Sequence, residues 1–252
     1  MNQTIIHHLT ELVEQIKREE EPKWKFKVKQ YKNAIKKIKH YPKALESGKE
    51  ARENIEGIGE GISKRIDELI KTGKIKELKE KPREQLICEE LERIHGIGPK
   101  QSKRLQEDGI TGIEDLKQKI EQGYKIDETI KKCIKYTYDL EHRIPRKEIE
   151  EIDILLSRLL IRTGLPLEHT ICGSYRRGHP TSGDIDVLIT NKEGTTLDHP
   201  LETLVTLLTS IGLIREHITE HGSTKYMGIC KHVSSSYNRR IDIRYVPREE
   251  YS

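Results

Sequence analysis

The spacing of hydrophobic residues changes near residue 145 and divides the chain into two kinds of structure. Before that point, apolar residues recur every three or four positions, which predicts amphipathic helices. The first apolar stripe consists of Ile5, Leu9, Leu12, Val13 and Ile16. Further helices are expected over residues 30–40, 50–56, 62–71, 85–94, 100–107, 113–122 and 127–139. Glycines are expected to end three of these helices, because glycine readily adopts the left-handed conformation of a helix C-terminus: Gly73, Gly109 and Gly123.

After Pro145 the pattern predicts one long helix over residues 146–162, which ends at Gly164. Short stretches of alternating apolar and polar residues follow, and alternation of this kind predicts strands. The expected strands cover residues 169–172, 184–190, 213–219, 225–230 and 240–246, with a helix over 200–211 between the second and the third. The chain is therefore expected to consist of a helical part followed by an α/β part, with boundaries near Pro82 and Arg143.

A glycine motif occurs twice in the helical part. The sequence Ile-x-Gly-Ile-Gly covers residues 55–59 and 94–98, and each copy lies between two predicted helices. Such turns let a DNA backbone come close, and the helix that follows offers N–H groups and cations such as Lys100 to a phosphate. The glycines concerned are Gly57, Gly59, Gly96 and Gly98. This is the helix–hairpin–helix pattern of sequence-independent DNA binding, and a turn used only for helix packing is the alternative.

The charges are distributed unevenly, although the net charge is only +4. Between residues 23 and 49 there are ten lysines and one acidic residue, Glu46, with aromatic residues in between. A one-sign cluster with aromatics is typical of a phosphate-binding face, and a solvated lysine-rich helix explains it equally well. With 33% hydrophobic and 35% charged residues, several small modules are favoured over one large core.

The sequence also excludes some classes of protein. The four cysteines show neither a Cys-x-x-Cys pair nor metal-ligand spacing, so reduced thiols in an intracellular protein are expected. The N-terminus carries Glu11 and Glu14 and lacks the apolar run of a signal peptide. No segment approaches the length of a membrane span, and no membrane partner is expected.

Candidate chemistry is concentrated in the α/β part. Asp184 and Asp186 lie two residues apart in an apolar run, so a strand places both carboxylates on one face. They would repel each other unless a cation lies between them, as in magnesium sites for phosphoryl or nucleotidyl transfer. Upstream, a Gly173–Ser174 turn and the forked donors of Arg176 and Arg177 suit a triphosphate.

A third carboxylate, Asp242, belongs to another alternating stretch. Ile241 and Ile243 are expected on one face of this strand, and Arg240, Asp242 and Arg244 on the other. A site for two metal ions needs about three acidic ligands besides the oxygens of the substrate. An Asp-x-Asp pair on its own would more simply be a solvated strand edge, but its combination with the glycine turn and the arginines favours the metal site.

At these residues the chain resembles the family X DNA polymerases of the polymerase beta type. The resemblance runs over essentially the whole chain and rests on residues 143–146, 173–178, 182–186, 224–228 and 239–244. It implies a multidomain α and α/β fold, in which two helical helix–hairpin–helix modules precede a nucleotidyltransferase palm with a mixed β-sheet. The expected domains are residues 1–82, 83–142 and 143–252.

The resemblance also implies roles for individual residues. Asp184, Asp186 and Asp242 would bind two Mg²⁺ ions, and Asp242 would accept the proton of the primer 3′-hydroxyl. The incoming nucleotide would be held by Arg143, Ser174, Arg177 and Gly183. Lys225 would contact primer phosphate, and Arg240 would restrain Asp242. A Na⁺ or K⁺ ion at each hairpin would be held by the backbone of Glu53, Ile55 and Ile58 and of Glu92, Ile94 and Ile97.

As partners the family implies gapped or nicked DNA and deoxynucleoside triphosphates, used for short-gap filling in base excision repair. A monomer is expected, in the nucleus if the source is a eukaryote. Two other classes stay open: a non-catalytic gap- or end-binding DNA module, and a nucleotidyltransferase that acts on RNA or a small molecule. The paired hairpins favour DNA over the last of these.

The chain departs from the family at two places. The lysine that forms a Schiff base with deoxyribose phosphate falls on Arg65, whose guanidinium stays protonated. Lyase activity is therefore expected to be weak or absent, while Lys27, Tyr31 and Arg65 are expected to bind a 5′-phosphate. Family members also continue into a thumb, whereas this sequence ends at Ser252, so poor templated synthesis by this polypeptide alone is expected.

Overall fold

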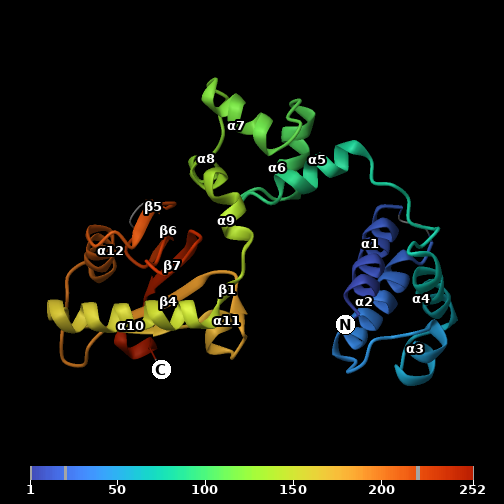
Figure 1. Cartoon of the computed structure of the whole chain (residues 1–252). Helices are drawn as coiled ribbons and strands as arrows, with labels where there is room; N and C mark the ends of the chain where they lie inside the picture. Colours follow the sequence, from blue (N-terminus) through green and yellow to red (C-terminus); the bar gives the residue numbers. More distant parts are fainter. Residues whose placement is uncertain (1, 20–21, 220–221, 252) are drawn as a thin grey trace. The chain divides into compact units, whose positions relative to one another are not determined.

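The computed structural model describes residues 2–19, 22–219 and 222–251, in the order of elements shown in Figure 1. The chain forms two compact units, one up to Pro82 and one from Arg83 onward. Each unit has hydrophobic clusters of its own. Among the described residues, no helix combines the length and the apolar character that a membrane crossing requires.

The first unit is a bundle of helices around one core. Its elements are α1 (Gln3–Glu19), α2 (Trp24–His40), α3 (Gly48–Asn54) and α4 (Glu60–Thr72). The predicted apolar stripe of α1 is largely buried, and Tyr31 and Ile38 of α2 and Ile66 of α4 pack in the same cluster. The α3–α4 connection is the first glycine motif, and Gly73 ends α4 in the left-handed conformation, as predicted.

Helix α2 begins at Trp24, six residues before the predicted start at residue 30. Lysines alternate with apolar residues from Lys23 to Lys29, and this spacing of two hides the helical period. The buried positions of the helix are Val28, Tyr31, Ala34 and Ile38, which recur every three or four residues. The lysines between them lie on exposed parts of the helix surface.

The second unit begins with a further set of short helices. These are α5 (Arg83–Leu91), α6 (Pro99–Glu107), α7 (Ile113–Glu121), α8 (Glu128–Cys133), η1 (Ile134–Tyr136) and α9 (Thr137–Glu141). The helix predicted over residues 127–139 is interrupted by the 3₁₀ turn η1. There the hydroxyl of Thr137 donates a hydrogen bond to the carbonyl of Ile134, as Thr often does where it competes with a helix.

A two-layer α/β structure completes this unit. Its main elements are α10 (Arg146–Thr163), β2 (Leu167–Ile171), α11 (Gly173–Arg176), β4 (Ile185–Asn191), α12 (Pro200–Ser210), β5 (Ile214–His217), β6 (Lys225–Cys230) and β7 (Arg239–Tyr245), followed by η2 (Arg248–Glu250). The sheet has the order β2-β4-β7-β6-β5 (Figure 1). Among the described strands of this sheet, only the β4–β7 pair is parallel, and the predicted mixed sheet is thus confirmed.

One face of this sheet is covered and the other carries the acidic residues. Ile185, Val187 and Ile189 of β4 pack with Ile241 and Ile243 of β7 in one cluster, which also contains the buried residues of α10 and α12. Asp186 and Asp242 occupy the alternate positions of the same strands and are only half-buried. The predicted alternation of the two faces is confirmed. A second small sheet, β1 (Ile144–Pro145) with β3 (Thr181–Ser182), was not predicted.

A buried ion pair fastens the sheet to its surroundings. Arg239, at the start of β7, donates two hydrogen bonds of 2.8 Å to the carboxylate of Glu148 on α10. It donates a third, of 2.7 Å, to the carbonyl of His142, just before β1. The side chain of Arg239 is only 4% exposed and that of Glu148 11%. The pair therefore joins a strand, a helix and a connecting segment at one point.

We predict that Glu148→Ala lowers the free energy of unfolding of the second unit by about 3–5 kcal/mol, because it leaves the Arg239 guanidinium buried without its counter-charge. Urea unfolding followed by far-UV circular dichroism measures this change. The fluorescence of the single tryptophan, Trp24, follows the first unit and is expected to stay unchanged.

Glu150→Ala is the matched control. Glu150 lies on the same helix but pairs with Arg146 at the surface, at 3.3 Å, so its removal should cost less than about 1 kcal/mol. Equal losses in the two variants would contradict a special role of the buried pair.

Candidate metal and nucleotide site

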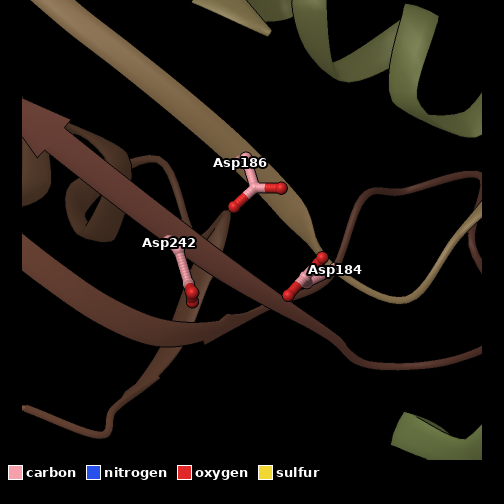
Figure 2. Close-up of side chains that lie close together, drawn as sticks. All are labelled: Asp184, Asp186 and Asp242. Carbon is pink, nitrogen blue, oxygen red and sulfur yellow. The ribbon is translucent and has the colours of Figure 1, made fainter. Parts of the chain in front are cut away.

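Strand pairing brings the three aspartates together. Asp186 and Asp242 are direct partners in the parallel β4–β7 pair, and Asp184 immediately precedes β4. Each residue offers a carboxylate oxygen, and these three oxygens all lie within 4.8 Å of one another. Figure 2 shows the three carboxylates gathered around one space between the two strands. The residues predicted as metal ligands are thus close together in the structure.

The electrostatics of this cluster are unfavourable without a cation. Burial raises the pKa of the Asp242 carboxyl, and the negative charge of Asp186 raises it further, while Arg240 lowers it. Oδ1 of Asp242 is buried and accepts no hydrogen bond from the described residues. Three carboxylates with unused oxygen lone pairs are the donor set that hard divalent cations prefer. The cluster therefore fits a site for a divalent metal ion.

Arg240 lies between two of the carboxylates and forms an ion pair with each of them. Its Nη2 donates a short hydrogen bond to Oδ2 of Asp184, whereas its Nε lies 3.6 Å from Oδ1 of Asp242. The expected partner, Asp242, is thus in contact with Arg240, and its restraint by Arg240 stays a prediction. In the structure, Arg240 holds Asp184 more closely.

The second glycine motif contacts this site, because His95 within the motif lies against Arg240. This contact of His95 was not predicted. Both ring nitrogens of His95 lie 3.4 Å from Nη1 of Arg240. Burial, and then the charge of Arg240, lower the pKa of His95, so its neutral form is favoured. His95 lies between Ile94 and Gly96, within the motif itself. No sequence signal connected this histidine with a strand more than a hundred residues away.

Gly173 is required by the position of Asp186. Its φ is +59°, and a Cβ atom there would collide with the carboxylate of Asp186. The peptide N–H of Cys172 donates to the carbonyl of Asp186 at 2.8 Å, which keeps the turn against β4. The residues that follow form the helical turn α11, and Ser174 donates from its hydroxyl to Ser182 at 2.7 Å.

The residues predicted to bind the nucleotide, together with Lys225, which is predicted to contact primer phosphate, lie in two neighbouring places. Arg177 and Lys225 line a cleft of about 670 Å³ together with Gly173, Asp186 and Asp242. The others lie beside the sheet β1–β3: Arg143 donates to the carbonyl of Thr181 at 2.7 Å, Gly183 lies next to its guanidinium, and Ser174 contacts Ser182. Gly183, Asp184, His95 and Arg240 line a smaller cavity of about 310 Å³. Their binding roles stay predictions.

The two hairpins have matching geometry. Gly57 and Gly96 have φ values of +88° and +99°. In both hairpins an N–H group closes the turn onto a carbonyl three residues earlier, Ile58 onto Ile55 and Ile97 onto Ile94. A carbonyl oxygen has two lone pairs, so the predicted cation ligands Ile55 and Ile94 keep one for an ion. Gly59 and Gly98 are the N-caps of α4 and α6.

In the first unit, Arg65 has a partner that the sequence analysis did not anticipate. Its guanidinium donates two hydrogen bonds to the carboxylate of Glu77, one of them 2.7 Å long, and a third to the carbonyl of Gly61. It also lies 5.9 Å from the ring centroid of Tyr31, which is buried. The charge predicted to bind a 5′-phosphate is thus already balanced by a carboxylate.

We predict that Gly173→Ala weakens Mg²⁺ binding at least about tenfold, because the new methyl group displaces the Asp186 carboxylate. Isothermal titration calorimetry with Mg²⁺ alone measures the affinity. Gly178→Ala is the matched control, since Gly178 also has a positive φ, +76°, but a Cβ atom there meets open space. In both variants an alanine at positive φ adds backbone strain of about 1–2 kcal/mol. An equal loss of Mg²⁺ affinity in both would therefore refute the role of the collision between the new Cβ atom and Asp186.

Two family models match this chain, one in its N-terminal part and one in its C-terminal part. Residues 1–75 match the model of a helix-hairpin-helix domain, and residues 143–248 match the model of the DNA polymerase beta palm. Two curated relatives carry the name DNA polymerase lambda. The one from Arabidopsis thaliana is 32% identical over 237 residues, which cover 88% of this chain and 43% of the relative. The one from Rattus norvegicus is 28% identical over 229 residues, with shares of 88% and 39%.

The chain therefore spans about two fifths of the length of these relatives. The matched segments coincide with the hairpin-containing first unit and with the α/β structure that carries the aspartates. Motifs, fold and relatives agree, and the chain belongs to the family X DNA polymerases.

Proposed function

We propose that this chain catalyses DNA-directed nucleotidyl transfer, adding a deoxynucleotide to a primer 3′-hydroxyl at short gaps during DNA repair. The observation that carries the proposal is the cluster of Asp184, Asp186 and Asp242, whose oxygens lie within 4.8 Å of one another beside a cleft. The similarity of the chain to relatives named DNA polymerase lambda supports the proposal. We take residues 1–82, 83–142 and 143–252 as its domains.

The aspartates would hold two Mg²⁺ ions. When bound, these ions stabilise the negative charge that develops on the attacking and leaving oxygens. Asp242 is suited to receive the proton of the 3′-hydroxyl at Oδ1, because this oxygen is buried and burial raises the pKa of the carboxyl. Arg240 would keep Asp184 in place.

The cleft would receive the incoming nucleotide. Arg177 lines it and supplies a forked donor for phosphate oxygens, and Ser174 follows Gly173 at its edge. Arg143 and Gly183, at the sheet β1–β3, would contact the same triphosphate. Lys225, which also lines the cleft, would contact a phosphate of the primer strand.

Gapped or nicked DNA would be bound mainly through its backbone. Both hairpins present glycine turns followed by helix N-termini, which suit phosphate groups without reading the sequence. A Na⁺ or K⁺ ion at each hairpin would assist. The exposed lysines of α2 would extend the contact in the first unit. The protein would act as a monomer within the cell, in the nucleus of a eukaryote.

The alternative is a non-catalytic module that binds gaps or ends of DNA. The hairpins and the lysines favour it as much as they favour a polymerase, because binding does not need the aspartates. Nucleotide incorporation separates the two functions.

We predict that Asp242→Asn lowers Mg²⁺-dependent incorporation into a one-nucleotide gap at least about a thousandfold, since several kcal/mol of transition-state stabilisation are removed. Affinity for the gapped duplex should change less than about twofold. Asp198→Asn, the same change at an exposed aspartate, is the control and should retain activity. Undiminished incorporation by Asp242→Asn would refute the mechanism, and intact binding without incorporation by the wild type would support the binding module.

We further propose that the first unit lacks deoxyribose-phosphate lyase activity. Arg65 cannot form an imine, and a lysine at this position would stay protonated beside Glu77. Borohydride trapping on incised abasic DNA should therefore give no adduct with the wild type, little with Arg65→Lys and most with Arg65→Lys/Glu77→Gln. Strong crosslinking by the wild-type protein would contradict the proposal.

A further inference from the structure

A second concave surface in the second unit lies away from the aspartates. It is a cavity of about 510 Å³ between α6 and the segment that joins α7 to α8. From α6 it is lined by Lys100, Gln101 and Arg104, and from the joining segment by Tyr124 and Lys125. Leu105 and Ile126 add an apolar part.

The three cations of this cavity differ from their neighbours. Among the described residues, no carboxylate forms an ion pair with Lys100, Arg104 or Lys125. Most other cations on α6, α7 and α8 are paired: Lys103 with Glu107, Lys117 with Glu114, Lys119 with Asp115 and Lys131 with Glu128. Three of the four cations of these segments without an ion pair among the described residues, Lys100, Arg104 and Lys125, thus line one cavity, and only Lys132 lies outside it.

The acidic groups nearby already have hydrogen-bond donors. Asp127 caps α8 and accepts from the N–H of Thr129 at 2.8 Å. Asp108 accepts from the hydroxyl of Tyr124 at 2.7 Å. Three cations against the one carboxylate that lines the cavity leave it positively charged.

This arrangement is unfavourable unless an anion is present. Lys100 and Arg104 are four residues apart, so they lie on the same side of α6, and like charges at this spacing destabilise a helix. Lys125 adds a third positive charge from the opposite wall. An anion with several oxygens would relieve this repulsion and would accept hydrogen bonds from all three side chains.

We propose that this cavity binds a phosphodiester of the DNA strand that contacts the hairpin of residues 94–98. Lys100 follows Gly98, the N-cap of α6, by two residues, so the cavity continues directly from the hairpin. Lys100 and Arg104 are about 6 Å apart along the helix axis, which extends the contact along one strand. The inference rests on the proposed function, because it presupposes that the hairpin binds DNA.

The test compares two double variants of the full chain that remove the same charge. Arg104→Gln/Lys125→Gln empties the cavity of two cations, and Lys117→Gln/Lys131→Gln removes two paired ones. Fluorescence anisotropy with a labelled gapped duplex gives the Kd at several KCl concentrations. The cavity variant should bind about tenfold more weakly near 0.1 M KCl, with a slope of log K against log [KCl] that is smaller by about 1, because one phosphate contact is lost.

The outcomes separate this inference from the proposed function. If the wild type binds and both double variants weaken binding equally, the cavity is not a phosphate site. If the wild type does not bind the duplex at all, the proposed function fails and the inference with it. Thermal unfolding checks the fold, and the cavity variant should melt at the wild-type temperature or above it, since repulsion is relieved.

A free polyphosphate offers the same phosphate oxygens as a DNA strand and is the alternative ligand for this cavity. Calorimetric titration of the wild type with inorganic pyrophosphate, without DNA or metal, tests it. Weak binding to the wild type is expected, and weaker binding to the cavity variant, because free pyrophosphate meets the same cations but lacks the contact of a DNA strand with the hairpin. Binding that disappears in Arg104→Gln/Lys125→Gln while the Kd for DNA is unchanged would overturn the assignment to a DNA strand.

Discussion

The repulsion among three carboxylates is the constraint on which the site depends. Parallel pairing of β4 and β7 makes Asp186 and Asp242 direct neighbours, and the apolar faces of the same strands prevent them from moving apart. Arg240 balances part of the charge but leaves Oδ1 of Asp242 without a hydrogen bond among the described residues. The rigid α/β layers thus hold an arrangement that a divalent cation would stabilise.

The cations of this protein differ in their ion-pair partners. These partners distinguish cations with a structural role from cations that could bind a ligand. Arg239 is buried with Glu148 and joins three elements. Arg65 is balanced by Glu77, which argues against a strong 5′-phosphate site in the first unit. The cations around the cavity beside α6 have no ion-pair partner among the described residues. Arginine and lysine side chains are therefore expected to have different roles, depending on which carboxylates they contact.

The hairpin of residues 94–98 connects two parts of the second unit. His95 contacts Arg240, which in turn holds Asp184. A small apolar cluster, in which Cys133 of α8 packs with Ile218 and Ile229, also joins the short helices to the region of the sheet. A strand bound at this hairpin would consequently lie next to the residues that hold the aspartates. The hairpin and the carboxylates can be regarded as one site within this unit.

Much of the fold and of the site followed from local patterns in the sequence. Alternation along β4 and β7 predicted which side chains share a face, and the repeated glycine motif predicted both hairpins, because these properties depend on residues a few positions apart. The pairing of Arg240 with Asp184, the contact of His95 and the neutralisation of Arg65 by Glu77 were not predictable in this way. The sequence by itself determined which residues could form a metal site. Tertiary structure decided which cation balances which carboxylate, because such partners meet only when distant segments pack together.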